Sequence, residues 1–296
     1  MIQGGVTEAA NSAALAAAER REARGLFLLC SPAVLMIAFV VFLPIGWLFA
    51  LSFLNEQGGF TLDHYARMLH PAYTRSFQTT FELSFLVTAI CAALGYPLAY
   101  LMSQTSTVWR ALIFVCVLFP FWTSLLVRTY AWLVLLQRRG VVNVWLQDIG
   151  LIEAPLRLVH NFTGTAIGMT QIMLPFMVLP LYAAMAAVDR DYVKAAASLG
   201  ASPLKSFWQV FFPLTLPGLL AGTVLVFVLC LGFYVTPAVL GGGRVLMWSM
   251  SIERSVAVYS DWGAASALGV VLLVVTLAIL WIMNRLFGVE RFIGGR

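Results

Sequence analysis

The stretch DRDYVKAAASLGASPLKSFWQVFFPLTLP, residues 189–217, carries the sharpest local signals in the chain. Asp191 is a favourable N-cap for a helix that begins at Tyr192, because its carboxylate can accept a hydrogen bond from the first turn. Gly200 suits the left-handed position that ends a helix, where a Cβ would be strained. These signals predict a short helix followed by a tight turn.

A second helix is predicted directly after that turn. Ser202 is a favourable cap, and Pro203 fits the first helical position because its missing N–H needs no partner there. An apolar stripe follows at helical spacing, formed by Leu204, Phe207, Trp208 and Phe211. Pro213 and Pro217 are expected to separate this helix from the next apolar segment. The stretch is therefore predicted to form a helical hairpin laid against a membrane face, a shape suited to docking on another protein.

Long apolar segments surround the hairpin on both sides. The chain of 296 residues is 61% hydrophobic and 10% charged, whereas soluble domains carry about 25% charged residues. A bilayer-spanning helix needs about 20 mainly apolar residues. Six stretches meet that length: Leu26–Leu51, Thr79–Met102, Ala111–Leu136, Phe162–Val188, Leu216–Leu240 and Ala264–Leu286. The sequence thus predicts an all-α, polytopic membrane protein with six transmembrane helices.

The expected organisation is a cytoplasmic N-terminal tail (1–25), a transmembrane domain (26–288) and a cytoplasmic C-terminal tail (289–296). Residues 1–18 are expected to be poorly ordered or to form a frayed helix. Both termini are placed inside because basic residues precede the first span and end the chain. An even number of spans also returns the chain to the same side. Ten of the 18 basic residues then lie inside. The other eight lie in the outer half or outside: Arg67, Arg75, Arg128, Arg138, Arg139, Arg157, Arg244 and Arg254.

Motifs for enzymatic chemistry are absent from the sequence. A phosphate-binding loop requires Gly-Lys-Ser/Thr, but the two lysines follow Val193 and Leu204. The sequence has no nucleophilic triad or catalytic carboxylate pair, and its four cysteines and three histidines have no metal-ligand spacing. Basic residues are spread along the chain, which argues against nucleic acid as a partner. We therefore expect no catalytic residues, no metal site and no cofactor on this chain.

The hairpin resembles the loop that marks the permeases of ATP-binding-cassette (ABC) importers, whose pattern is E-A-A-x3-G-x9-I-x-L-P. The residues at these positions are Ala195, Ala196, Gly200, Val210 and Pro213, with Phe212 in place of the family's Leu. In that family the loop forms a coupling helix that docks in a cleft of the cytoplasmic ATPase. The resemblance implies a docking loop at residues 189–213 that includes Asp191, Tyr192, Lys194, Ala195, Ala196, Gly200, Ala201, Ser202, Pro203 and Pro213.

Lys194 departs from that pattern, since the family has Glu at this position. With Asp191 as the cap, Lys194 is predicted at the third helical position, where Glu closes a capping box and favours the helix dipole. Lys does neither, which costs about 0.3–1 kcal/mol. The change also removes any salt bridge that the family's Glu would make with the ATPase.

A wider part of the chain, about residues 26–288, is similar to the spermidine/putrescine permease group. The similar stretches are Pro120–Leu136, Leu174–Met185, Ser198–Gly222 and Leu231–Gly242. The resemblance implies a type I ABC importer permease fold in a bacterial inner membrane. It also implies a second permease subunit, two cytoplasmic ATPase subunits that bind ATP and Mg²⁺, and a periplasmic binding protein that delivers the solute. A polyamine is the expected solute, with an opine or another small organic solute as the alternative.

Several polar and aromatic groups in the spans are candidates for the solute path. Arg128 lies deep in the third apolar stretch, where a charge is costly unless it faces a cavity, pairs with another helix or snorkels to the interface. The other candidates line a wet path or form hydrogen bonds between helices. They are Trp122, Thr123, Tyr130, Thr170, Gln171, Phe233, Tyr234 and Thr236. Their aromatic rings are suited to cation–π contact with a cationic solute.

Ion-coupled secondary transport is the main rival class. Such carriers bury acidic residues or histidine in their spans as ion sites. Glu82 is the only acid in the six stretches, and it lies near the predicted outer face. The sequence therefore favours an importer permease and leaves a secondary transporter as the alternative.

Overall fold

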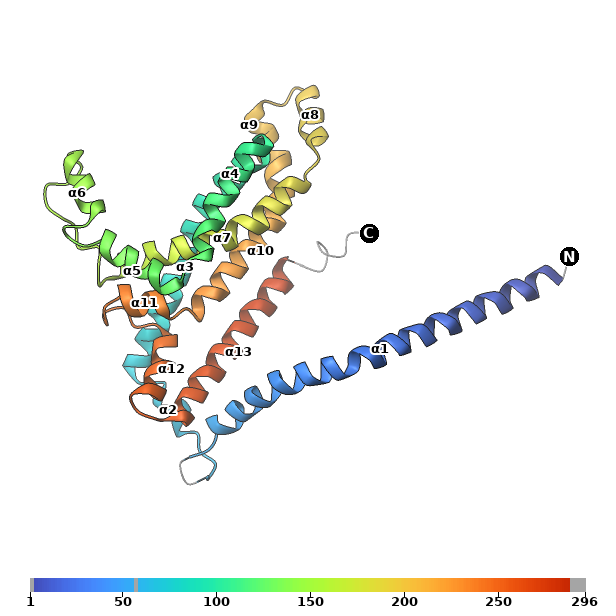
Figure 1. Ribbon diagram of the computed structural model, residues 1–296, viewed down its shortest axis with the longest axis horizontal. Coiled ribbons are helices and arrows are strands. Elements are labelled where there is room, and N and C mark those ends of the chain that lie inside the picture. Colours follow the sequence, from blue (N-terminus) through green and yellow to red (C-terminus); the bar gives the residue numbers. More distant parts are fainter. Residues whose placement is uncertain (1–2, 56–57, 288–296) are drawn as a thin grey trace.

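The computed structural model describes residues 3–55 and 58–287, and the regular elements in this part of the chain are all helices (Figure 1). The long helices are α1 (Gln3–Ser52), α3 (Pro71–Gln104), α7 (Phe162–Ala187), α10 (Phe212–Leu231) and α13 (Trp262–Phe287). The shorter ones are α2 (Asp63–Arg67), α4 (Thr107–Leu118), η1 (Phe119–Trp122), α5 (Leu125–Leu135), α6 (Val141–Asp148), α8 (Arg190–Ser198), α9 (Pro203–Ser206), η2 (Phe207–Phe211), α11 (Val235–Leu240) and α12 (Trp248–Ala257).

Helices α3, α7 and α10 pack against one another and form the core of the bundle. Each contributes fully buried apolar side chains, such as Leu83 on α3, Met177 on α7 and Val226 on α10. Glycines let the helices approach closely: a Cβ on Gly218 of α10 would stand 2.8 Å from the Pro180 carbonyl oxygen of α7. Close approach through small residues is typical of helices that associate in a bilayer.

Five helical segments in the described chain are long and apolar enough to cross a membrane: Leu28–Ser52, Pro71–Gln104, Phe162–Ala187, Pro203–Leu231 and Trp262–Arg285. A sixth crossing is formed if Thr107–Trp122 and Leu125–Leu135 are one span. That pair is bent by 102° at residues 123–124, so the predicted span over Ala111–Leu136 is a broken helix. The α-helix changes to a 3₁₀ turn at Phe119–Trp122, which contains Pro120. Thr123 then has an extended backbone, with φ −91° and ψ 150°.

Helix α1 projects away from the bundle (Figure 1). It meets the bundle at α13, and Ile45, Leu48 and Phe49 line a crevice with α12 and α13. The backbone of residues 3–25 belongs to this helix, so of the two alternatives for the N-terminal tail the structure has the helix. The predicted tail at 289–296 lies outside the described residues. Exposed side chains such as Leu35 and Phe39 on α1 are suited to contact with lipid.

The two ends of the bundle differ in character. Helices α8 and α9 project at one end, directly after α7 and before η2 and α10 (Figure 1). At the other end lie α2, α12 and the loops that precede α7 and follow α11. Since α7 has 26 residues and rises about 1.5 Å per residue, its two ends lie on opposite sides of a bilayer.

Candidate functional site

The candidate site is the hairpin of α8 and α9, which we call the docking hairpin (residues 189–213). Helix α8 begins at Arg190, and its N-cap is Asp189, whose carboxylate accepts a 2.9 Å hydrogen bond from the Asp191 N–H. The prediction of Asp191 as the cap was therefore wrong by two residues. Both aspartates are good caps, and the extended Val188 that ends α7 brings Asp189 into the capping position first.

The turn of the hairpin is the one that the sequence predicts. Gly200 has φ +83°, which confirms the left-handed conformation. Its N–H donates to the Ala197 carbonyl at 3.0 Å, and the Ala201 N–H donates to the Ala196 carbonyl at 3.0 Å, which together form a Schellman motif. A Cβ on Gly200 would meet nothing within 4 Å, so the turn presents open backbone at its tip.

The second helix of the hairpin, α9, begins where the sequence predicts, but the helix continues beyond its predicted end. The Ser202 hydroxyl accepts a 3.3 Å hydrogen bond from the Lys205 N–H, and Pro203 is in the first turn of α9. The expectation that Pro213 and Pro217 would separate this arm from the next span was wrong, because residues 203–231 are helical without interruption. A π turn at η2, closed by the Phe212 N–H on the Phe207 carbonyl, widens the helix just before Pro213 and accommodates its missing donor.

Lys194 occupies a different position from the one predicted. It is the fifth residue of a helix that begins at Arg190, so it is not at the third position and the capping-box argument does not apply. Its ammonium donates a 2.7 Å hydrogen bond to the Asp191 carboxylate, and both side chains are exposed. Exposed pairs contribute about 0–1 kcal/mol, so this pair sets the charge pattern of α8 more than its stability.

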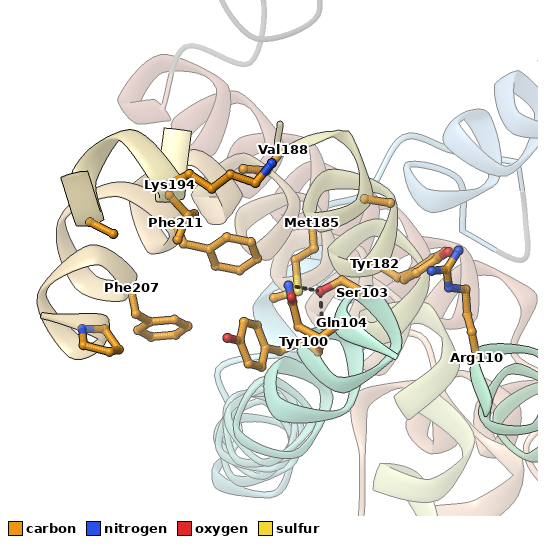
Figure 2. Close-up of a pocket in the computed structure, with 14 residues that line it drawn as sticks. Tyr100, Ser103, Gln104, Arg110, Tyr182, Met185, Val188, Lys194, Phe207 and Phe211 are labelled. Carbon is orange, nitrogen blue, oxygen red and sulfur yellow. Dashed lines mark hydrogen bonds between the residues drawn. The ribbon is translucent and has the colours of Figure 1, made fainter. Parts of the chain in front are cut away.

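A cavity of about 510 Å³ lies between the docking hairpin and the ends of α3, α4 and α7 (Figure 2). Aromatic rings form part of its wall: the Tyr100 ring meets Phe207 and Phe211 edge-on, at centroid distances of 5.5 and 5.3 Å. Arg110 on α4 closes one side and donates to the Met102 and Thr105 carbonyls, each at 3.2 Å. The sequence pattern placed Phe207 and Phe211 on the apolar stripe but did not indicate Tyr100 or Arg110, because the wall joins segments about 80 to 110 positions apart in the chain.

The bent third span exposes a second group of predicted residues. Trp122 is 88% exposed, and the Thr123 hydroxyl donates to the Pro120 carbonyl at 2.7 Å at the bend. Arg128 lies one turn into α5, with its guanidinium 5.8 Å from the centre of the Phe121 ring. Its Nε and Nη1 atoms are buried and have no hydrogen-bond partner within the described chain. A buried donor without an acceptor is costly, so this guanidinium is a candidate for contact with another molecule.

The comparison with known proteins identifies the family. The family described as the binding-protein-dependent transport system inner membrane component matches residues 92–287. The chain belongs to this family. It is therefore a non-catalytic permease subunit and a multi-pass component of the inner membrane.

Two curated relatives cover most of this permease. It is 32% identical over 255 residues to the spermidine/putrescine transport system permease protein PotB of Haemophilus influenzae, which covers 84% of this chain and 89% of that protein. It is also 32% identical over 259 residues to PotB of Escherichia coli K12, which covers 84% and 94%.

Solved structures show the fold. A bacterial ABC transporter involved in the import of the acidic polysaccharide alginate aligns with a TM-score of 0.73 and 18% identity, over 90% of the permease and 96% of that chain. An amino acid ABC transporter aligns with a TM-score of 0.53 and 18% identity, over 78% and 99%. The permease has the type I ABC importer permease fold, as predicted.

The remaining path candidates of the permease lie where α5, α7 and α11 meet. Thr236 on α11 is fully buried, and its hydroxyl lies 3.2 Å from the Thr129 hydroxyl on α5, which joins the two helices. Trp132 donates to the Gln171 amide oxygen at 3.3 Å, while the buried Thr170 hydroxyl donates to the Ala166 carbonyl of its own helix at 2.7 Å. Around α11, the Phe233 carbonyl accepts from Ser249 and the Tyr234 ring is partly exposed.

Proposed function

We propose that this permease forms part of the translocation path of an ABC importer for a polyamine, and that the docking hairpin binds a separate ATPase subunit. The observation that carries the proposal is the hairpin itself. It projects from the bundle between α7 and α10, and its tip is the open Gly200 turn. A loop with this shape and position supports docking on a cytoplasmic protein.

The energy for transport is supplied by partners in this proposal. A dimer of ATPase subunits binds ATP and Mg²⁺, a second permease subunit completes the path, and a periplasmic binding protein delivers the solute. Both termini of the permease are cytoplasmic, on the side of the docking hairpin, and residues 26–288 form the transmembrane domain. Docking residues Asp191, Tyr192 and Lys194 lie on exposed parts of α8 and would face the ATPase.

Motion of the ATPase would reach the path through two helices. Helix α7 leads directly into α8, and α9 continues through η2 into α10. Both long helices pack on α3, so a displacement of the docking hairpin shifts the core of the bundle. The bent third span, with Trp122 and Arg128, lies beside this core and is the proposed lining of the path.

A polyamine is the solute that the relatives favour. The two PotB proteins are named for spermidine and putrescine, and each aligns with 84% of this chain. The exposed aromatic rings of Trp122 and Tyr130 near the bend are suited to ammonium groups by cation–π attraction. An opine or another small organic solute is the second candidate, because much of the selection in such importers lies on the binding protein.

Uptake into proteoliposomes tests the proposal. The permease is reconstituted with its ATPase, second permease and binding protein, and radiolabelled spermidine and putrescine are supplied with and without enclosed ATP. We expect uptake that requires ATP and persists when ionophores remove ion gradients. Uptake that needs no ATP and collapses with ionophores would instead establish a secondary transporter. ATP-driven uptake of an opine but not of a polyamine would keep the importer and reject the solute.

A further inference from the structure

Three arginines meet in one cavity at the end of the bundle opposite to the docking hairpin. This arginine cavity has a volume of about 500 Å³, and its polar lining is formed by Gln137, Arg138, Arg157, His160 and Arg244, with Gly242 between the loops. These polar residues come from the turn directly after α5, the loop before α7 and the loop after α11. They are up to 107 positions apart, so the fold alone brings them together.

The cavity lies on the side of the membrane away from the ATPase. The loop with Arg157 and His160 precedes the first residue of α7, and the docking hairpin follows the last. In the same way, Arg244 lies beyond the far end of α10, which begins at the hairpin. Two independent spans therefore place the cavity and the docking hairpin on opposite faces.

The positive charge of the cavity has no counterpart in the described chain. Its lining contains no aspartate or glutamate. The ion pairs among residues 3–55 and 58–287 are Arg67–Asp261 and Lys194–Asp191, and neither involves this cavity. Basic residues are disfavoured on the outer side of membrane proteins, so three unpaired arginines gathered there require a reason.

The walls of the cavity are held in place by buried polar contacts. The fully buried Asn143 side chain donates to the Gln137 and Leu156 carbonyls at 2.9 and 3.1 Å and accepts from the Leu156 N–H at 2.8 Å. Asn161 bonds the Arg157 carbonyl and also caps α7 by accepting from the Gly164 N–H at 2.8 Å. The arginines therefore project from a braced frame, so little ordering of the backbone is needed when a partner binds.

The contact between the two loops is equally tight. A Cβ on Gly242 would stand 2.2 Å from His160 Nδ1, so only glycine fits there while His160 keeps its place. His160 itself has φ +59°, a conformation that non-glycine residues rarely adopt. Strained backbone of this kind is frequent at binding sites.

We propose that the arginine cavity receives acidic side chains of the solute-binding protein. The guanidinium fork matches a carboxylate in geometry and binds it by two parallel hydrogen bonds. A solute is a poor fit, because a polyamine would be repelled by three arginines. This inference rests on the proposed function, since it requires an importer that is served by a binding protein, and it adds the surface and the charge of the contact.

The test measures binding of the importer's own binding protein to the complete permease–ATPase complex in nanodiscs. Arg138→Glu, Arg157→Glu and Arg244→Glu are each compared with Arg139→Glu, an adjacent exposed arginine outside the cavity lining. We expect each cavity variant to raise Kd about tenfold, to lower the on-rate, and to weaken the salt dependence of binding. The Arg139→Glu complex should bind like the wild type.

Neutral variants and lipid composition complete the design. Arg138→Gln and Arg157→Gln retain a polar side chain, and they should raise Kd less than the charge reversals while leaving the size-exclusion profile unchanged. Binding by the cavity variants that equals that of Arg139→Glu would overturn the proposal. A cavity effect seen only in nanodiscs with anionic lipid would also overturn it, because the site would then belong to a lipid phosphate. Failure of the wild-type complex to import any solute would count against the proposed function instead.

Discussion

Met177 on α7 lies directly against Gly222 on α10. A Cβ on Gly222 would stand 2.8 Å from the Met177 sulphur and 3.1 Å from the Met177 carbonyl oxygen. A thioether can move aside, but the carbonyl belongs to the α7 backbone and cannot. The two helices are therefore in contact at the smallest separation that their side chains allow, at the centre of the bundle.

Gly222→Ala is expected to destabilise the bundle. The added methyl group forces α10 away from α7, and overpacking of this kind costs about 1–3 kcal/mol. Thermal unfolding of the detergent-purified permease measures the change. Gly269→Ala is the matched control, because a Cβ on Gly269 of α13 meets nothing within 4 Å, and alanine there should leave the melting temperature unchanged or raise it. Equal effects of the two substitutions would contradict the packing argument.

Gly200→Asp is expected to uncouple the importer. A Cβ at φ +83° adds roughly 1–2 kcal/mol of local strain, and the carboxylate projects from the tip of the docking hairpin into the space that the ATPase would occupy. Membrane levels should be retained, while uptake and ATPase co-purification are lost. Gly150→Asp is the control, since Gly150 has φ +72° and open space around it but lies in the loop after α6. Normal uptake and docking in Gly200→Asp would show that the hairpin is ordinary surface.

Lys194→Glu restores the residue of the family's pattern and is expected to weaken docking on this importer's own ATPase. The substitution reverses a charge on the exposed surface of α8 and places two carboxylates three residues apart, at Asp191 and position 194. The change in stability should stay below about 1 kcal/mol, because both side chains are exposed. Co-purification of the ATPase at two salt concentrations gives the measurement, with Lys194→Gln as the neutral comparison. Tighter docking in Lys194→Glu would mean that the ATPase surface here is basic.

Arg128→Met is expected to separate stability from transport. Removing a guanidinium whose Nε and Nη1 have no acceptor relieves a desolvation cost, so the isolated permease should unfold at the same temperature or higher. Uptake by the assembled importer should fall sharply if another molecule supplies the acceptor. Arg128→Lys tests the geometry, since an ammonium keeps the charge but not the planar fork. A large loss of stability in Arg128→Met would show that the arginine serves this chain alone.

The topology is tested by reporters at His160 and Ser202. These residues flank opposite ends of the segment that contains α7, so a cytoplasmic reporter should be active at Ser202 and inactive at His160. A thiol-labelling assay on single cysteines at the same positions gives an independent measurement. Labelling of both positions from one side would refute the topology with both termini inside.

Features that depend on neighbouring residues are predictable from the sequence. The left-handed Gly200 and the Ser202–Pro203 helix start are fixed within four positions, and the structure confirms both. The long apolar helices follow from length and composition, because about 20 apolar residues are sufficient to identify a span. The family's loop pattern was sufficient to indicate an importer permease.

Features that depend on competition between two similar local signals, or on contacts between distant segments, are not predictable in this way. Asp189 and Asp191 are equally good N-caps by residue type, and the position at which α7 ends decides that Asp189 is the cap. Proline at 213 predicts a break, but a π turn that no local pattern encodes removes the conflict. The arginine cavity is invisible in the sequence, because Arg138, Arg157 and Arg244 become neighbours only through the packing of α5, α7 and α11.

The continuity of residues 203–231 has a mechanical consequence. A helix of 29 residues is roughly 43 Å long, and this one starts at the Ser202 cap and ends beside α11 without a flexible joint. It therefore transmits movement as one rigid rod, and its close contact with α7, between Gly218 and Pro180, lies near its middle. A tilt of about 5° imposed at the hairpin end would therefore displace the other end, about 20 Å from Gly218, by roughly 2 Å.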